Sequence, residues 1–142
     1  VRERISYEGQ AAIELEHLAG AVPAAAYPCS VEDGVIHGGE LLAAAHDDLA
    51  AGRPRAEIAA AFHEGVAAVF ATACAEAGET GTVCKTVALS GGCMQNLRLL
   101  ASLRARLERM GFRVLSHEAV PPNDAGVSYG QAAVAAARLA CA

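Results

Sequence analysis

Three observations predict an α/β protein that is rich in helices and has a small, partly parallel sheet. Short β-prone runs at 86–90 and 112–115 flank a segment in which leucines recur at helical spacing from Leu97 to Leu107. Strand, helix and strand with short joints make a βαβ unit, here at 86–116, whose strands must be parallel. Apolar residues are 54% of the chain but aromatic residues only 4%, so the core must be built from helices packed closely through small side chains.

Apolar periodicity predicts four further helices. We expect them at 7–18, at 41–49, over about 20 residues from position 58 to a stop near 78–81, and from about 126 to 139. Glycine or proline follows the first two of them, at Gly20 and at Gly52 with Pro54.

A β-hairpin is expected in the segment between the first two helices. Short β runs at 25–27 and 35–36 lie on either side of Pro28, Asp33 and Gly34, which are residues typical of turns.

Length, charge and hydropathy limit the function classes. The 142 residues suit a single domain at 1–142, and a start at Val1 rather than Met is typical of a domain cut out of a longer protein. The net charge is -5 with no block of Lys or Arg, which argues against nucleic-acid binding. We find no signal peptide and no apolar stretch of the roughly 18 residues a membrane span needs, so a cytoplasmic protein is expected.

The cysteines and histidines form no recognisable metal motif. Five cysteines without a CxxC pair indicate reduced thiols rather than a zinc or redox site. His63-Glu64 resembles the start of a zinc-protease motif, but Ala67 stands where the second histidine is required. Cys93 at a helix start is either a reactive thiol or, as the burial preference of cysteine favours, a buried packing residue.

Two loops are expected to meet at the edge of the sheet where ligands bind. The loops 90–96 and 121–126 follow the two parallel strands and lead into helices, so two positive helix ends should face the same space. Gly91 and Gly92 lack a Cβ and let an anion approach backbone N–H groups, which suits phosphate binding. The alternative is a plain strand-to-helix turn.

Three polar residues in these loops have two readings each. Asn96, one turn into its helix, is either a nucleoside-binding amide or a solvated first-turn residue. Asn123 and Asp124 precede the last helix, where one of them caps it. In the sharper interpretation Asp124 binds a metal and Asn123 orients the metal or the phosphates. Gly126 and Gly130, four residues apart, favour close packing of this helix against a neighbour.

Four stretches, in order along the chain, resemble the hydrogenase-maturation carbamoyltransferase (HypF) family. They are 5–16 (ISYEGQAAIELE), 61–63 (AFH), 87–96 (VALSGGCMQN) and 120–126 (VPPNDAG), the last followed by Gly130-Gln131-Ala132. Each stretch is loose alone, but the set is specific and spans nearly the whole chain.

The resemblance implies the second lobe of an actin/Hsp70/sugar-kinase-like fold, in which ATP lies between two lobes. It implies Gly91 and Gly92 near the phosphates, Asn96 at the nucleoside and a metal on Asp124. Gly9 and Glu14, in the first stretch, are weaker matches for the ribose side. The family's paired metal histidines lie in the first lobe and have no HxxxH counterpart here.

The implied reaction is ATP-dependent carbamoyl transfer from a carbamoyl-adenylate to the C-terminal Cys of a partner protein in [NiFe] hydrogenase maturation. Carbamoyl phosphate lies upstream, Mg²⁺ accompanies ATP, and a divalent Fe or Zn sits between the lobes. This chain would supply only half of the nucleotide and metal site and would be inactive alone. The alternatives are an O-carbamoyltransferase of a small molecule with the same fold, or a noncatalytic interaction module.

Overall fold

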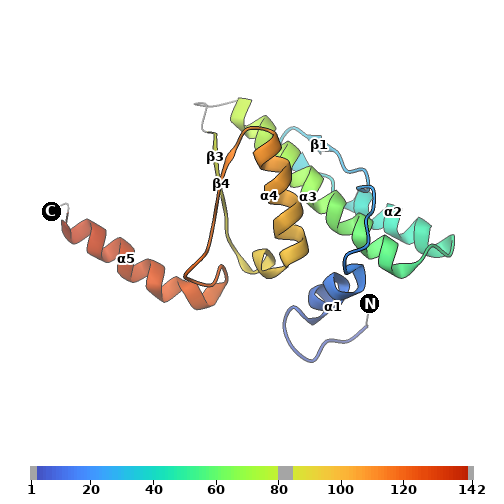
Figure 1. Cartoon of the computed structure of the whole chain (residues 1–142), viewed down its shortest axis with the longest axis horizontal. Helices are drawn as coiled ribbons and strands as arrows, with labels where there is room; N and C mark the ends of the chain where they lie inside the picture. Colours follow the sequence, from blue (N-terminus) through green and yellow to red (C-terminus); the bar gives the residue numbers. More distant parts are fainter. Residues whose placement is uncertain (1–2, 80–84, 141–142) are drawn as a thin grey trace.

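The computed structural model describes residues 3–79 and 85–140, in which three helices pack around one long central helix, a fifth helix extends away, and the strands form two small two-stranded sheets (Figure 1). In chain order the elements are α1 (Gln10–Ala19), β1 (Val31–Glu32), β2 (Val35–Ile36), α2 (Gly39–Ala50), α3 (Arg55–Glu79), β3 (Thr86–Leu89), the 3₁₀ turn η1 (Gly92–Gln95), α4 (Leu97–Arg109), β4 (Arg113–Ser116), the 3₁₀ turn η2 (Asp124–Gly126) and α5 (Val127–Ala140). The α/β class and all five predicted helices are confirmed.

The βαβ unit predicted at 86–116 is present. Strands β3 and β4 are parallel, with Thr86 opposite Arg113 and Leu89 opposite Ser116, and α4 connects them. Gly111 follows α4 with a φ of 84°, a conformation that a residue with a side chain adopts only at a cost. The chain thereby turns from the helix into β4 within a few residues.

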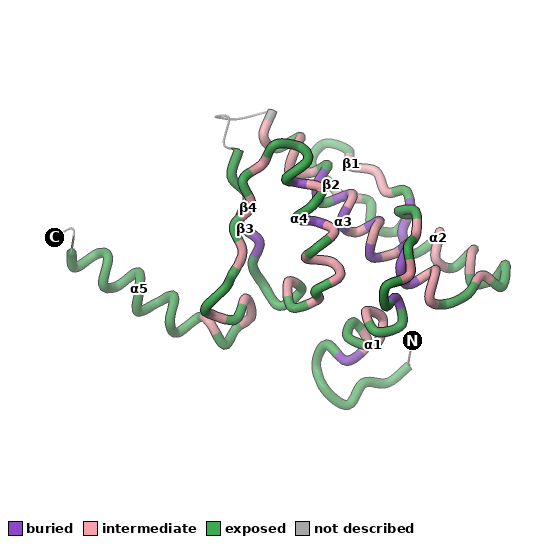
Figure 2. The backbone as a smooth tube through the Cα atoms, viewed as in Figure 1, coloured by how far each residue is buried: buried purple, intermediate pink, exposed green. Residues whose placement is uncertain are grey.

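Helix α3 contributes to each of three hydrophobic clusters. Buried residues recur along its length (Figure 2). In the first cluster Ala59 and Ala60 pack against α1, and in the second Ala61 packs with Leu41 of α2 and with Tyr27, which precedes β1. The third cluster joins α3 to α4 and β3. The third cluster consists of Ala67, Ala71, Leu89, Leu103 and Leu107. The small-side-chain core predicted from composition is therefore present.

Gly65 of α3 allows Leu41 and Tyr27, which pack with Ala61, to lie close to the helix backbone. A Cβ on Gly65 would lie 2.6 Å from Leu41 Cδ2 and 3.0 Å from the carbonyl oxygen of Tyr27. A side chain at this position would therefore have to move the Leu41 side chain and crowd the Tyr27 carbonyl.

The expectation that no segment is long and apolar enough for a membrane span is wrong for α3. Residues Arg55–Gly78 reach that length and hydropathy, with half of the most apolar window buried inside the molecule. Its buried alanines face α1, α2 and α4, which is how a core helix packs.

The predicted hairpin exists, but its first strand was misplaced. Strand β1 is Val31–Glu32, antiparallel to β2 (Val35–Ile36), and the run 25–27 is not a strand. Asp33 and Gly34 both have positive φ, 51° and 77°, so they form a two-residue turn that requires strands directly on either side. Tyr27 instead donates its backbone N–H to the Ala61 carbonyl of α3 and buries its ring.

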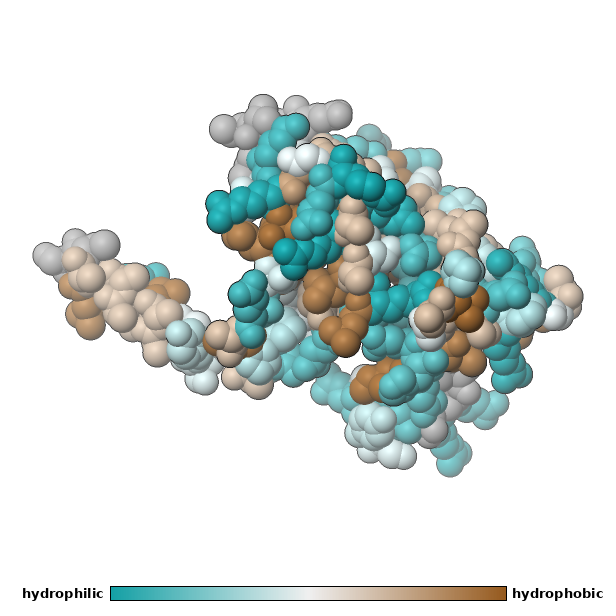
Figure 3. Space-filling view, viewed as in Figure 1, coloured by the Kyte–Doolittle hydropathy of each residue, from teal (hydrophilic) through white to brown (hydrophobic). Residues whose placement is uncertain are grey.

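Helix α5 extends away from the rest of the fold, and each of its described residues is exposed (Figures 1 and 2). Apolar side chains lie along it, Tyr129 and Leu139 being 66% and 81% exposed (Figure 3). The predicted helix packing at Gly126 and Gly130 is wrong within this chain. Gly126 belongs to η2, where a Cβ would lie 2.6 Å from the Pro121 carbonyl oxygen, and a Cβ on Gly130 would meet open space.

Candidate functional site

The two loops that the sequence places at the carboxyl edge of the sheet are in direct contact. The backbone N–H of Gly91, after β3, donates to the carbonyl oxygen of Pro122 at 2.8 Å. Ser90 Oγ lies 2.9 Å from Nε2 of His117, the residue that follows β4. The loops 90–96 and 121–126 therefore form one continuous surface, as predicted from the parallel strand order.

The glycine pair has the geometry of a turn that exposes backbone donors. Gly91 has a φ of 95° and a ψ of 161°, a region that is almost restricted to glycine. Within the described residues the N–H groups of Gly92 and Cys93 have no acceptor, and both residues are exposed. Two successive amides of this kind attract an anion. Cys93 is exposed, so the expectation that it is a buried packing thiol is wrong.

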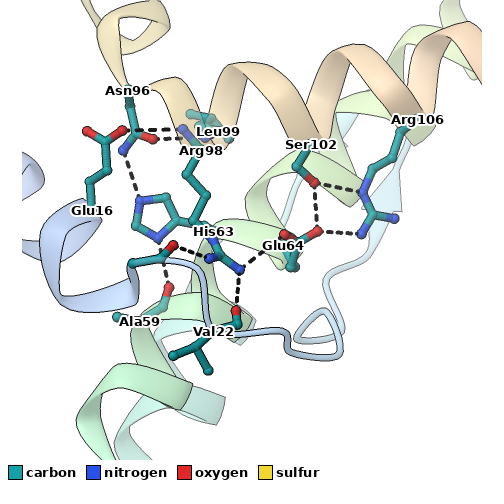
Figure 4. Close-up of polar contacts among 11 residues, drawn as sticks. Glu16, Val22, Ala59, His63, Glu64, Asn96, Arg98, Leu99, Ser102 and Arg106 are labelled. Atoms are coloured by element: carbon teal, nitrogen blue, oxygen red, sulfur yellow. Dashed lines mark hydrogen bonds and ion pairs between the residues drawn. The ribbon is translucent and has the colours of Figure 1, made fainter.

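Asn96 ends the turn η1 and is the N-cap of α4, rather than a residue one turn into that helix. Its side-chain oxygen accepts from the backbone N–H of Leu99 at 2.8 Å, and its Nδ2 lies 2.9 Å from His63 Nε2 (Figure 4). The side chain is half-buried, so the solvated first-turn interpretation does not describe it. The amide is held in one orientation at the mouth of the loop.

The N-terminus of α4 is already paired with a carboxylate from α1. Glu16 Oε1 accepts from the backbone N–H of Leu97 at 2.7 Å and from that of Arg98 at 3.3 Å. Together with the Asn96 cap, these bonds use the first three free donors of the helix. The expectation that α4 offers an open helix end to a phosphate is therefore wrong, and the exposed amides of Gly92 and Cys93 are the better anion donors.

In the second loop, 121–126, we predicted that one residue of the pair Asn123-Asp124 is a helix cap, and Asn123 is that cap. Asn123 caps η2, accepting from the Ala125 N–H at 3.2 Å through Oδ1. A Cβ on Gly92 would lie 3.9 Å from Asn123 Cβ, so this cap borders the glycine turn. Asp124 is exposed, and no donor among residues 3–79 and 85–140 bonds its carboxylate.

Asp124 is the only carboxylate in the two loops 90–96 and 121–126, so it is the only metal ligand of this type that they contain. No group of three or more His, Cys, Asp or Glu residues that could hold a metal occurs in the described part of the chain. A metal bound at Asp124 therefore needs further ligands from phosphate, water or another part of the protein.

The two residues from the first stretch lie on α1. Gly9 is its N-cap with a φ of 77°, and Glu14 Oε1 accepts from Gln10 Nε2 at 3.2 Å. A groove between α1 and the start of α4 is lined by Glu16, His17, Gly20, Gln95, Leu97 and Arg98. Glu16, two positions beyond Glu14, is the α1 carboxylate that reaches this groove.

A partly buried ion network fixes α4 on α3. Glu64 accepts from Ser102 Oγ at 2.6 Å and from Arg106 at 2.9 Å, and Arg98 lies 3.4 Å away (Figure 4). Burial opposes ionisation of Glu64, but the bonds from Ser102 and Arg106 and the two guanidinium charges outweigh it. The pKa of Glu64 is therefore below its ordinary value.

Sequence reasoning missed three residues of the site: Glu16, His63 and His117. Glu16 and His117 act across 81 and 27 residues of sequence, a separation that no local pattern reveals. His63 belongs to the 61–63 stretch, and its position on the apolar face of a long helix was the available signal.

Comparison with known proteins gives one consistent family. The model for the "Carbamoyltransferase, Kae1-like Domain, second subdomain" family matches residues 1–131. The carbamoyltransferase HypF of Rhodobacter capsulatus is 40% identical over 137 residues, covering 96% of this chain and 17% of that protein. A HypF homolog of Cupriavidus necator is 40% identical over 146 residues, covering 96% of this chain and 36% of its own length.

Two solved structures share the fold. A full-length HypF in a phosphate- and nucleotide-bound form superposes with a TM-score of 0.86 at 34% identity, over 94% of this chain and 18% of that one. The HypF of T. kodakarensis gives a TM-score of 0.80 at 31% identity, over 98% of this chain and 18% of that one. The chain thus spans a minor part of the relatives it matches. Its sequence and its fold place it in the HypF carbamoyltransferase family, as the second subdomain of the Kae1-like domain.

Proposed function

We propose that this chain supplies one half of a nucleotide and metal site for ATP-dependent carbamoyl transfer. The acceptor in this proposal is the C-terminal Cys of a partner protein in [NiFe] hydrogenase maturation, and the donor is a carbamoyl-adenylate made from carbamoyl phosphate elsewhere in the protein. The observation that carries the proposal is the contact between the loops 90–96 and 121–126, held by the Gly91 to Pro122 hydrogen bond. The remaining parts of the reaction belong to regions outside this chain.

The nucleotide half of the site uses backbone and amide groups. The Gly92 and Cys93 amides, which have no acceptor among the described residues, suit phosphate oxygens. Asn96 and Asn123 border the same surface with oriented side-chain amides. Gly9 and Glu14 on α1 are assigned to the ribose side. In support, the structurally similar full-length HypF is described as phosphate- and nucleotide-bound.

The metal half uses Asp124. Its carboxylate is exposed and has no bonded donor among the residues that the structure describes. It is a hard oxygen ligand of the kind that Mg²⁺ prefers, and it lies on the loop that touches the glycine turn. One carboxylate also fits a divalent Fe or Zn held mainly by ligands from the first lobe. When bound, the metal neutralises phosphate charge and polarises the carbamoyl oxygen.

The residues of this chain bind and orient; none of them is assigned as a general base. The Gly92 and Cys93 amides hold negative charge, Asn96 fixes the nucleoside end, and Asp124 places the cation. A cytoplasmic location accords with the free thiols of the three described cysteines, Cys29, Cys74 and Cys93.

The test of this function is Asp124→Ala in a full-length HypF carbamoyltransferase carrying this segment. Loss of the metal ligand is expected to lower carbamoyl transfer on the order of 100-fold without changing the fold. Asp47→Ala is the matched control, because Asp47 is an exposed aspartate on α2. Equal turnover by the Asp124 variant and the control would remove Asp124 from the mechanism.

A second experiment asks whether this chain alone carries the half-site. We expect Mg²⁺-ATP titrated into the chain to shift backbone amide signals at 90–96 and 123–126. Shifts confined to other regions, in the chain and in the full-length protein alike, would show that these loops form no nucleotide site.

A further inference from the structure

We propose that His63 is a positioning residue that locks the side-chain amide of Asn96 and so presets the end of the glycine loop for nucleotide. The inference rests on the proposed function, because it explains how the assigned nucleoside residue acquires its orientation. His63 is the polar member of the 61–63 stretch and lies between Ala59 and Asn96 (Figure 4).

The tautomer of the His63 ring follows from its neighbours. His63 is 5% exposed on α3, and its Nδ1 lies 2.7 Å from the carbonyl oxygen of Ala59. A carbonyl oxygen can only accept, so Nδ1 carries the hydrogen. Because Asn96 Oδ1 is bonded to the Leu99 N–H, Asn96 turns its Nδ2–H toward His63, and in this tautomer the Nε2 lone pair accepts it at 2.9 Å.

The other end of the Asn96 amide is fixed independently. Its Oδ1 accepts the Leu99 N–H, so a 180° rotation of the amide would break two bonds and set the Asn96 oxygen against the His63 lone pair. The Asn96 backbone is also bonded at both groups, to Cys93 and Leu100. One Nδ2 hydrogen has no acceptor in the described residues, and its direction is set by His63.

The role of His63 is separable from general support of α4. Helix α4 is held on α3 by a second set of contacts, in which Glu64 pairs with Ser102, Arg106 and Arg98. These contacts involve no atom of Asn96. Glu64 and His63 are adjacent in sequence, so removing each in turn distinguishes loss of helix packing from loss of amide orientation.

The experiment measures Mg²⁺-ATP affinity of a full-length HypF carbamoyltransferase carrying this segment. His63→Phe keeps the ring volume but removes the acceptor, and we expect about 3- to 10-fold weaker binding, the worth of one hydrogen bond. His63→Gln supplies an acceptor oxygen and is expected to recover most of the affinity. Glu64→Gln, the control, is expected to lower thermal stability and leave affinity within about twofold.

A double-mutant cycle gives the decisive result. In an Asn96→Ala background, His63→Phe is expected to cause no further loss, because its effect passes through Asn96. A further loss of the same size in that background would overturn the inference alone. Unchanged affinity of Asn96→Ala would overturn the nucleoside assignment of Asn96, and the inference with it.

One readout requires no substitution. Long-range ¹H–¹⁵N spectra of the His63 ring in the intact protein should show the hydrogen on Nδ1. A hydrogen on Nε2 would leave Asn96 Nδ2 without an acceptor and would overturn the inference.

Discussion

Helices α3 and α5 are both rich in alanine, yet one is the core of the molecule and the other lies almost entirely in solvent. In α3, Ala59, Ala60 and Ala61 have no exposed surface, and Ala67 and Ala71 are equally buried. In α5, which begins at Val127, every described residue is exposed.

The difference shows that alanine content predicts a helix but not its burial. Helix α3 is buried because α1, α2 and α4 each bring larger residues to its small-residue face, such as Leu41 and Leu107. Among the described elements, helix α5 packs mainly on η2, the turn that precedes it. Substitutions on the two helices should therefore change the free energy of unfolding by different amounts and, for glycine, in opposite directions.

The largest difference is expected from removing a leucine side chain. Leu107 of α4 is fully buried against Ala67 and Ala71 of α3. Leu107→Ala should leave a cavity there and lower the free energy of unfolding by about 2–5 kcal/mol. Leu139→Ala on α5, where the leucine is 81% exposed, should change it by less than about 0.5 kcal/mol. Urea denaturation of this chain measures both, and equal costs would mean that α5 is buried in solution.

One glycine from each helix, Gly65 of α3 and Gly130 of α5, should give effects of opposite sign on stability when it is replaced by alanine. Gly65→Ala forces a Cβ against Leu41 and the Tyr27 carbonyl and is expected to cost about 1–3 kcal/mol. Gly130→Ala meets open space on α5 and should add up to about 1 kcal/mol of helix stability. Thermal unfolding of the two variants tests the contrast, which a stabilising Gly65→Ala would refute.

The smallest expected effect is a pH dependence on the α3 side. The folded pKa of Glu64 lies below its unfolded value, so its ionised form contributes stability above the ordinary pKa of 4.5. That contribution is lost as pH falls through the folded pKa. The stability gap between the protein and Glu64→Gln should thus be constant above about pH 5 and shrink below it. Glu108→Gln, which breaks an exposed pair with Arg104, is the control and should show no comparable gap.

Local patterns predicted most of the fold. The leucine repeat from Leu97 and its flanking β runs gave the parallel pair β3 and β4, because that periodicity is set by burial of one helix face. The misplaced strand at 25–27 arose because a β-prone run can also pack against a helix, as Tyr27 does on α3. The Asp33-Gly34 pair was the better predictor of the strand positions, because Asp-Gly is typical of a two-residue hairpin turn with strands directly on either side. Both residues have the positive φ that such a turn requires.

The site was predictable where it depends on strand order and local turns. Parallel strands bring the loops 90–96 and 121–126 to one edge, and Asn123 follows the ordinary preference for a capping residue. The preference of asparagine for the N-cap was also the signal that would have placed Asn96 correctly. The pairing of Glu16 with the start of α4 was not predictable, because it depends on how α1 docks on α3 and α4.

Because the Gly91 amide is hydrogen-bonded to Pro122, its exchange with solvent reports whether the loops 90–96 and 121–126 are in contact. Amides in exposed loops ordinarily exchange with solvent quickly, whereas the Gly91 amide can exchange only when the loops separate. Its rate of deuterium uptake therefore reports the fraction of time that the surface between the loops is broken. A nucleotide that bridges the loops should slow exchange at Gly91 even without touching that amide, and a molecule that wedges between them should speed it.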